Sequence, residues 1–146
     1  MERPTLTLDD LSVGQRFESD TLTVTADEIV AYATLYDPQP FHTDPEAAKT
    51  SFFGGLAASG WHTAALSMRL LIGSFRVEGG IIGGGGDLQW MKPVRPGDTL
   101  RVETEILAIT PSRTRPDRAS VLIRVLTRNQ DGDDVQSFTP KLVVTR

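Results

Sequence analysis

The sequence predicts an α+β domain in which an antiparallel β-sheet curls around one long α-helix. Residues 60–74 are apolar around most of the helical circumference, which is typical of a buried helix. Residues 100–106 alternate between apolar and polar side chains, and residues 119–128 are rich in β-branched ones. Because such strands need a cover on one face, a sheet wrapped around the central helix would bury both.

Length and composition limit the possible classes of protein. The 146 residues, 39% apolar and 23% charged, suit one compact domain over residues 1–146. A net charge of −4 gives no attraction to polyanions, so nucleic acid is not an expected partner. The absence of cysteine excludes disulfides, thiolate metal sites and cysteine nucleophiles. With no signal peptide and no apolar run of about 18 residues, we expect a cytoplasmic protein that does not bind membranes.

The first expected elements are a strand over residues 16–24 and a helix directly after it. Thr25 can cap the first amides of this helix, and Glu28, three residues later, completes a capping box. The helix should end near Tyr36. Another helix is expected to begin at residues 44–46, Asp-Pro-Glu, because proline is favoured at the first helical position.

The strongest helix signal lies in residues 60–74. An apolar stripe with helical spacing predicts the face that packs on the core. The stripe consists of Trp61, Ala65, Met68, Ile72 and Phe75, widened by Ala64 and Leu71. The expected solvent face is thin and consists of His62, Thr63, Ser67, Arg69 and Ser74. His62 is most simply a histidine at a helix terminus or a packing interface.

The second half of the chain is expected to form strands. Leu88 and Trp90 suggest a short strand, and a turn at Asp131 and Gly132 joins the last two strands. Pro140 interrupts the final strand over residues 134–144, which implies a bulge or a sheet edge. The glycines at 79–80 and 83–86 match no nucleotide-binding motif. They indicate a flexible loop, or a strand that another backbone or a substrate approaches closely.

A proline-stiffened segment carries the first candidate chemistry. Pro38 and Pro40 fix much of the backbone between Asp37 and His42, so residues 37–43 are expected to form a rigid, non-helical loop. Such a loop can hold a carboxylate and an imidazole as an acid/base pair. Two simpler interpretations are that these residues end a helix and lie on the surface, or that they bind a metal. The metal site would add Asp44 to the same two side chains.

The start of the long helix supplies the third component. Ala58, Ser59 and Gly60 lead into its N-terminus, where free amides and the helix dipole stabilise developing negative charge. Gly60 has no Cβ, so a substrate carbonyl could approach its N–H closely. A carboxylate, an imidazole and an amide donor together suit proton transfer next to a carbonyl group.

Four stretches carry a resemblance to a known family. They are DPQPFH at 37–42, DPEAA at 44–48, ASGW at 58–61 and KPVRPGD at 92–98. Together they resemble the MaoC-like (R)-specific enoyl-CoA hydratases over most of the chain. The family's hallmark is Asp-x-Asn-Pro-x-His, which Asp37, Pro40 and His42 match, while Gln39 replaces the Asn. Tyr36 stands where the family commonly has glycine.

The resemblance implies a hot-dog fold, a homodimer or dimer-based oligomer, and addition of water to a trans-2-enoyl-CoA. It implies that Asp37 and His42 are catalytic and that Gly60 binds the thioester oxygen. With this mechanism we expect Gln39, Phe41, Ser59 and Trp61 at the substrate, and Phe52, Phe53 and Trp90 as further pocket aromatics. The alternative is that these aromatic side chains belong to the core, which is their more common place. No cofactor is implied, because CoA is part of the substrate.

Two other functions remain open on the sequence. A hot-dog acyl-CoA thioesterase would share the fold and the amide donor but would direct water to the carbonyl. A non-catalytic subunit would bind acyl thioesters without turnover. Separately, Arg113, Arg115 and Arg118 form either a solvated loop or a contact for CoA phosphates, which arginine binds in bidentate fashion.

Overall fold

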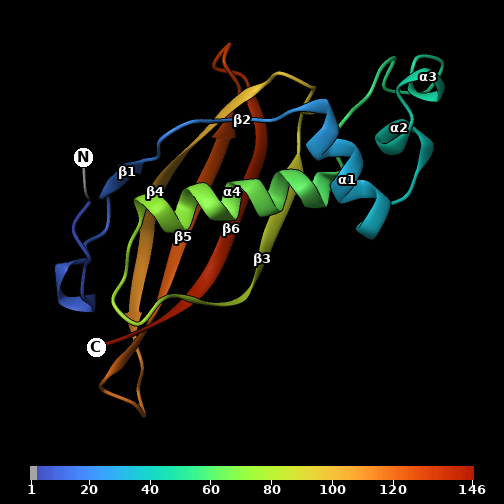
Figure 1. Ribbon diagram of the computed structural model, residues 1–146. Coiled ribbons are helices and arrows are strands. Elements are labelled where there is room, and N and C mark those ends of the chain that lie inside the picture. Colours follow the sequence, from blue (N-terminus) through green and yellow to red (C-terminus); the bar gives the residue numbers. More distant parts are fainter. Residues whose placement is uncertain (1–2) are drawn as a thin grey trace.

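The computed structural model describes residues 3–146, with a six-stranded antiparallel sheet and one long helix across it (Figure 1). The strand order is β1-β4-β5-β6-β3, and β2 pairs with β4 as well. The strands are β1 (Arg16–Glu18), β2 (Leu22–Thr23), β3 (Ile82–Trp90), β4 (Thr99–Pro111), β5 (Arg118–Arg128) and β6 (Asp134–Thr145). The predicted α+β class and hot-dog arrangement are confirmed.

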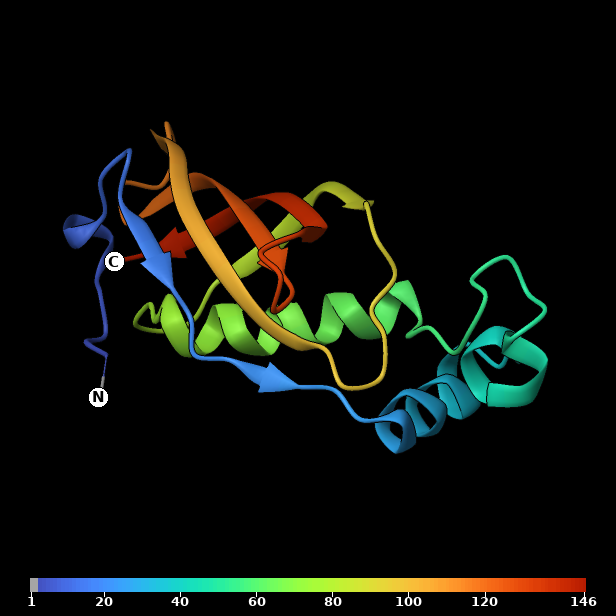
Figure 2. The ribbon, with the colours of Figure 1, turned by 90° about the horizontal axis from the view of Figure 1, so that it is seen from above.

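Three of the helices, α1 to α3, lie together at one end of the molecule (Figures 1 and 2). The helices are the 3-10 helix η1 (Leu8–Asp10), α1 (Ala26–Tyr36), α2 (Pro40–Thr43), α3 (Pro45–Ala48) and α4 (Gly60–Ser74). Figure 2 shows α1, α2 and α3 grouped beyond the N-terminal end of α4, away from the sheet. Within residues 3–146, no helix is both long and apolar enough to cross a membrane.

The predicted N-terminal caps of α1 and α3 are confirmed, and the expectation for the segment between these helices needs one correction. Thr25 and Glu28 form the predicted capping box of α1, and Asp44 caps α3. The expected non-helical loop over 37–43 is wrong in its second half, because Pro40 starts the one-turn helix α2. Proline stops a helix that precedes it, but its fixed φ also suits the first position of a new one.

The predicted orientation of α4 is also wrong in part. Trp61, Met68 and Ile72 are 59%, 41% and 46% exposed, although Phe75 is buried as expected. The buried residues within α4 are instead mostly polar: they are His62, Thr63, Ser67 and Ser74, together with Leu70 and Leu71. Within one protomer the sheet therefore covers one side of α4, and most of the apolar stripe faces outward.

Small polar side chains make the buried face of α4 possible. The Ser67 hydroxyl donates to the Thr63 carbonyl and lies 2.6 Å from the Thr127 hydroxyl of β5. Ser74 donates to the Leu70 carbonyl one turn back. Because these hydroxyls are satisfied, their burial carries little cost, and their small size lets α4 lie close to the strands.

The glycine-rich segment is a strand rather than a loop. β3 runs from Ile82 to Trp90 along β6 and is longer than expected, with a register shift between Gly83 and Gly86. A Cβ on Gly86 would lie 2.5 Å from Pro140 Cα, so glycine is needed where the two backbones approach. The irregularity expected at Pro140 of the final strand therefore lies opposite it, in β3, and β6 is an inner strand and not an edge.

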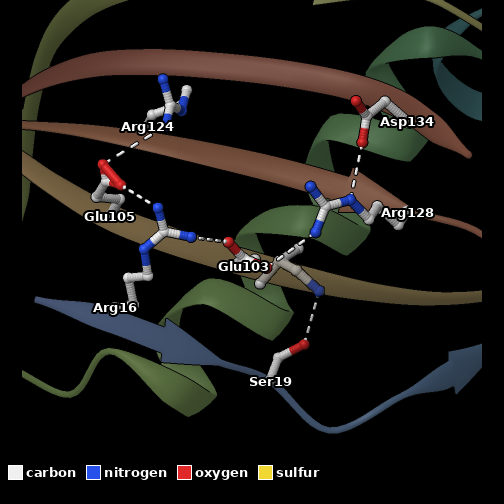
Figure 3. Close-up of polar contacts among 8 residues, drawn as sticks. Arg16, Ser19, Glu103, Glu105, Arg124, Arg128 and Asp134 are labelled. Atoms are coloured by element: carbon white, nitrogen blue, oxygen red, sulfur yellow. Dashed lines mark hydrogen bonds and ion pairs between the residues drawn. The ribbon is translucent and has the colours of Figure 1, made fainter. Parts of the chain in front are cut away.

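The outer face of the sheet carries a network of ion pairs (Figure 3). Arg16 of β1 reaches both Glu103 and Glu105 of β4 at 2.9 Å. Arg128 of β5 lies 2.9 Å from Glu103 and from Asp134 of β6. Glu103 and Glu105 alternate along β4 with the buried residues Val102, Thr104 and Ile106, so one face of the strand forms the core and ion pairs link the other face to its neighbours.

Candidate active site

The turn between α1 and α2 brings a carboxylate and an imidazole together. Asp37 ends α1, with its N–H donating to the Ala33 carbonyl. The backbone then turns through Pro38, and His42 N–H donates to the Gln39 carbonyl within α2. As a result, His42 Nε2 lies 3.5 Å from Asp37 Oδ2.

The His42 ring is buried and held in one orientation. Its Nδ1 lies 2.6 Å from the Ala57 carbonyl oxygen, which can only accept a hydrogen bond. The proton on Nδ1 is therefore committed to Ala57, and Nε2 is the nitrogen that faces Asp37. Phe41 packs edge-on against the ring, with centroids 4.6 Å apart. The imidazole thus has one free nitrogen, pointed at the carboxylate.

Both oxygens of the Asp37 carboxylate accept hydrogen bonds. Gln39 Nε2 donates to Oδ1 at 2.6 Å, and Ser59 Oγ donates to Oδ2 at 2.7 Å. Partial burial by itself raises the pKa of Asp37, but these two donors and the nearby His42 outweigh it and bring the pKa below its usual value. Asp37 is therefore a carboxylate, an acceptor, at neutral pH.

Ser59 joins this pair to the start of α4. It is completely buried and is the N-cap of the helix, with Oγ accepting from Trp61 N–H. The Gly60 amide belongs to the first turn, where amides have no partner within the helix. No acceptor among residues 3–146 takes this N–H. The predicted carboxylate, imidazole and amide donor are thus brought to one place.

The reason for glycine at position 60 differs from the expected one. A Cβ there would lie 2.6 Å from the indole ring of Trp90, closer than any real contact. The close neighbour is therefore a side chain of this chain, at the end of β3. The Trp90 indole Nε1 also donates to Gln136 Oε1 of β6 at 3.0 Å.

Two separate cavities lie beside the first turn of α4, and Trp90 lines one of them. The first, here called the histidine cavity, has a volume of about 330 Å³ and is lined by His42, Gly60, Trp90 and Lys92 among others. The second, the apolar cavity, has about 320 Å³ and lies between α4 and the strands β3, β5 and β6. Its lining includes Trp61, Met68, Leu71, Leu88, Gln136 and Phe138.

The predicted pocket aromatics divide between these cavities. Phe52, Phe53 and Trp90 line the histidine cavity, whereas Trp61 lines the apolar one. Phe41 lines neither and instead packs on Phe53 at a centroid distance of 5.1 Å. Only three of the five expected aromatic side chains thus border the same space as His42.

Arg95 is a site residue that the sequence analysis missed. Its guanidinium donates to the carbonyls of Phe53, Gly55 and Leu56. In addition, Ala58 N–H donates to the Val94 carbonyl at 2.9 Å. The segment after β3 therefore fixes the backbone that carries Ala57 and Phe53. The KPVRPGD stretch was a signal for this residue, but nothing in it specified three backbone acceptors.

Two weaker hypotheses find no support in the geometry. Asp44 accepts from Glu46 N–H as the cap of α3, and no three of the His, Cys, Asp or Glu side chains in the described part of the chain could hold a metal. The β4–β5 turn, with Arg113 and Arg115, lies at the opposite end of the molecule from α2 and α3 (Figures 1 and 2). Within one protomer these arginines therefore do not reach the site.

The second histidine is part of a packing interface. His62 is buried and stacks on Tyr32 of α1, with ring centroids 4.4 Å apart and an interplanar angle of 6°. Its Nδ1 has no hydrogen-bond partner among residues 3–146. Burial lowers the pKa of His62, and nearby Glu28 opposes this only partly. His62 lines neither cavity, as the simple packing interpretation predicts.

Comparison with known proteins identifies the family. A family model described as a MaoC like domain matches residues 10–125. The crystal structure of a MaoC-like dehydratase from Rhodospirillum rubrum is 58% identical, with a TM-score of 0.94 over 97% of each chain. The R-hydratase PhaJ1 from Pseudomonas aeruginosa is 27% identical, with a TM-score of 0.78 over 97% of this chain and 87% of that one.

A curated relative extends the match to nearly the full length. The uncharacterized protein YdeM of Bacillus subtilis is 35% identical over 139 residues, which is 94% of this chain and 96% of its own. The family model alone spans most of the chain, including Asp37, His42 and Gly60. On both grounds, the chain belongs to the MaoC-like dehydratase family.

Proposed function

We propose that this protein adds water to a trans-2-enoyl-CoA to give the (R)-3-hydroxyacyl-CoA, and catalyses the reverse dehydration. The main support is the 3.5 Å approach of His42 Nε2 to Asp37 Oδ2 beside the first turn of α4. Proton transfer α to a thioester carbonyl needs an acid/base pair and a donor that stabilises the carbonyl oxygen, and this site offers both. Membership in a dehydratase family points the same way.

The proposed reaction uses the pair as a proton relay. In the active form Asp37 is ionised and His42 Nε2 carries a proton. The oxygen of a water held by Asp37 attacks C3 of the enoyl group, and the water's proton passes to Asp37. Nε2–H delivers its proton to C2. The proton on Asp37 then returns to Nε2 across their 3.5 Å contact, which restores both groups.

The Gly60 amide completes the proposed mechanism. As C3 is attacked, charge develops on the thioester oxygen, and an N–H at a helix N-terminus can stabilise it. One such donor contributes about 2.7–4 kcal/mol to the transition state. The acid/base pair contributes a factor of about 10²–10⁴. Because neither suffices alone, the proposal requires Asp37, His42 and Gly60 together.

A direct assay separates this proposal from its rivals. Loss of the enoyl-thioester absorbance of crotonyl-CoA without release of free thiol is the expected result. Release of free thiol would instead indicate a thioesterase. Binding of the thioester with neither change would indicate a non-catalytic subunit, and both outcomes would contradict the proposal.

Substitutions in the pair give the corresponding prediction. Asp37→Asn and His42→Ala should each lower kcat by at least about 100-fold, because each removes one step of the relay. The double variant should lose little more than the worse single one, since the pair acts as a unit. Thermal unfolding checks that the fold persists. Asp44→Asn, which keeps an acceptor for the Glu46 amide, is the matched control and should retain activity.

We also propose that two copies of the chain associate through α4 and β3. Most of the apolar stripe of α4 is exposed in the protomer, and β3 has no strand on its outer side among residues 3–146. Exposed apolar stripes and free sheet edges usually mark an interface. A second copy offers the same two features, so a two-fold axis would cover both at once.

A further inference from the structure

The segment that carries the reacting groups is hydrogen-bonded to the rest of the molecule through one short stretch of chain. Among residues 3–146, every hydrogen bond from residues 38–58 to a partner outside residues 37–59 goes to Val94 or Arg95. Val94 accepts from the Ala58 N–H, and the Arg95 side chain donates the others. Arg95 is therefore the main polar link between this segment and the connection from β3 to β4.

Arg95 uses both terminal nitrogens of its guanidinium on the backbone. Nη1 donates to the Gly55 carbonyl at 2.9 Å and to the Leu56 carbonyl at 3.3 Å. Nη2 donates to the Phe53 carbonyl. Because the guanidinium is a planar, rigid fork, it fixes these carbonyls relative to one another. A lysine ammonium is a point charge on a flexible stem and cannot replace the fork at such a site.

The backbone of Arg95 is itself fixed by contacts outside that segment. Its N–H donates to Asp98 Oδ2 at 2.8 Å, and Asp98 is buried. The other oxygen of this carboxylate accepts from Gln130 Nε2, in the turn between β5 and β6, at 3.0 Å. The Asp98 carbonyl also accepts from the Val24 N–H, just before α1. The side chain of Arg95 therefore extends from a point that is tied to the sheet.

The residue that follows the bound carbonyls is the one that orients His42. The Ala57 carbonyl accepts from His42 Nδ1 at 2.6 Å, and the Ala57 N–H donates to the Phe41 carbonyl at 3.1 Å. These two bonds hold α2 against the segment. The ring of Phe53 also lies near the imidazole, with centroids 5.9 Å apart. A shift of residues 53–57 would therefore move the His42 ring.

We propose that Arg95 is a positioning residue for the reaction and that it acts on His42 through Ala57. This inference rests on the proposed function. While Arg95 holds the backbone, the Ala57 carbonyl keeps the Nδ1 proton, and Nε2 faces Asp37. Without Arg95 the carbonyl is free to move, and the imidazole loses the contact that sets its orientation. Arg95 lines neither cavity, so its effect is on His42 rather than on the substrate.

Arg95→Lys tests the proposal, because it keeps the charge and removes the fork. A displacement of about 1 Å at a reacting group can lower a rate by about 100-fold, so kcat for crotonyl-CoA should fall by at least about 10-fold. KM should change less than kcat. Arg146→Lys is the matched control, because Arg146 also donates to a backbone carbonyl, that of Pro116 in the β4–β5 turn, and pairs with Asp9. It should keep the kcat of the parent.

The His42 ring gives a readout that a loss of stability alone does not move. Nitrogen-15 NMR reports the protons on the ring nitrogens, and the chain has only two histidines. In the parent, the bond to Ala57 should protect the His42 Nδ1–H from exchange with solvent. In Arg95→Lys this protection should be lost. The signals of His62, whose Nδ1 has no partner among residues 3–146, should stay unchanged.

Two results would overturn the inference. One is a folded Arg95→Lys with the kcat of the parent. The other is an unchanged Nδ1–H signal, even where kcat falls, because the effect would then not pass through Ala57. If Arg95→Lys does not fold, Arg95→Gln, whose amide keeps a donor, should lower kcat and weaken the protection of Nδ1–H in the same way.

The NMR signal is measured without turnover, so it separates this inference from the proposed function. A parent that hydrates no enoyl thioester contradicts the proposed hydratase, whatever the signal of His42. A parent that is active, with an Arg95 variant whose His42 signal is unchanged, contradicts only the role of Arg95. The two failures are therefore distinct.

Discussion

Both oxygens of the Asp37 carboxylate accept hydrogen bonds, and these bonds favour the ionised form. Gln39 and Ser59 donate to the charged form, so they favour the ionised state that the proposed mechanism needs as a proton acceptor. The low pKa of Asp37 follows from these contacts, which outweigh its partial burial. The acid side of the activity profile is therefore expected to reflect the hydrogen bonds around one side chain.

Ser59→Ala tests this at the residue scale. Loss of the hydroxyl removes a donor to the charged carboxylate, so the pKa of Asp37 rises toward its usual value or above. Protonated Asp37 cannot accept the proton from water, so the acid limb of kcat/KM against pH should move to higher pH. The profile for crotonyl-CoA measures this shift directly.

The control for Ser59→Ala must account for its second role as a helix cap. Thr25→Ala also removes an N-cap, from α1, at a similar cost of about 1 kcal/mol, but Thr25 does not contact Asp37. Its acid limb should stay in place. Equal profiles for Ser59→Ala and the parent would show that Ser59 only caps α4.

Sequence reasoning finds residues whose side chains act, and misses those that act through the backbone. Asp37 and His42 stand out because prolines lie between them. The carbonyl that orients His42 belongs to Ala57, whose side chain has no functional group and so attracts no attention in the sequence. Arg95 donates hydrogen bonds to carbonyls about forty positions earlier in the chain. Such contacts depend on the fold, so no local pattern predicts them.

At the scale of elements, the contact between α1 and α4 depends on an uncharged histidine. His62 stacks on Tyr32 with an unpartnered Nδ1, and burial lowers its pKa. In the unfolded chain its pKa returns to about 6.5. The contribution of neutral His62 is therefore complete above that pH and is lost as pH falls through the lower, folded-state pKa.

His62→Phe should remove this pH dependence while keeping an aromatic ring against Tyr32. The free energy of unfolding, measured by denaturant titration from about pH 7.5 to about pH 5, should fall less in the variant than in the parent. Tyr32→Leu provides the comparison, because it removes the stacking but leaves the histidine titratable. Parallel curves for His62→Phe and the parent would contradict this account.

Hydrophobic spacing predicts that α4 is a helix, but it does not predict which face of the helix is buried. The spacing of Trp61, Met68 and Ile72 correctly predicts a helix with an apolar stripe, but not what the stripe contacts. Ser67 and Ser74 were expected to be exposed because they are polar. They are buried because each donates to a carbonyl of its own helix, a bond that hydrophobic patterns do not register.

At the scale of the whole molecule, the exposed stripe predicts the oligomeric state. Light scattering should give a mass of twice 15.9 kDa for the parent. Met68→Glu places a charge in the proposed interface, which is costly when buried without a partner, so this variant should be monomeric. Val13→Glu makes the same kind of change at an exposed apolar residue next to β1, at the other edge of the sheet, and should stay dimeric. A monomeric parent would refute the proposed interface.

The reacting groups and the sheet come from different stretches of sequence. Asp37, His42 and the Gly60 amide all lie within residues 37–60, a segment that contributes no strand. The strands supply the floor beneath α4, the ion pairs on the outer face, and Trp90. Substitutions at Asp37 or His42 therefore alter the reacting groups without touching a strand, so the sheet should persist in variants that have lost the acid/base pair.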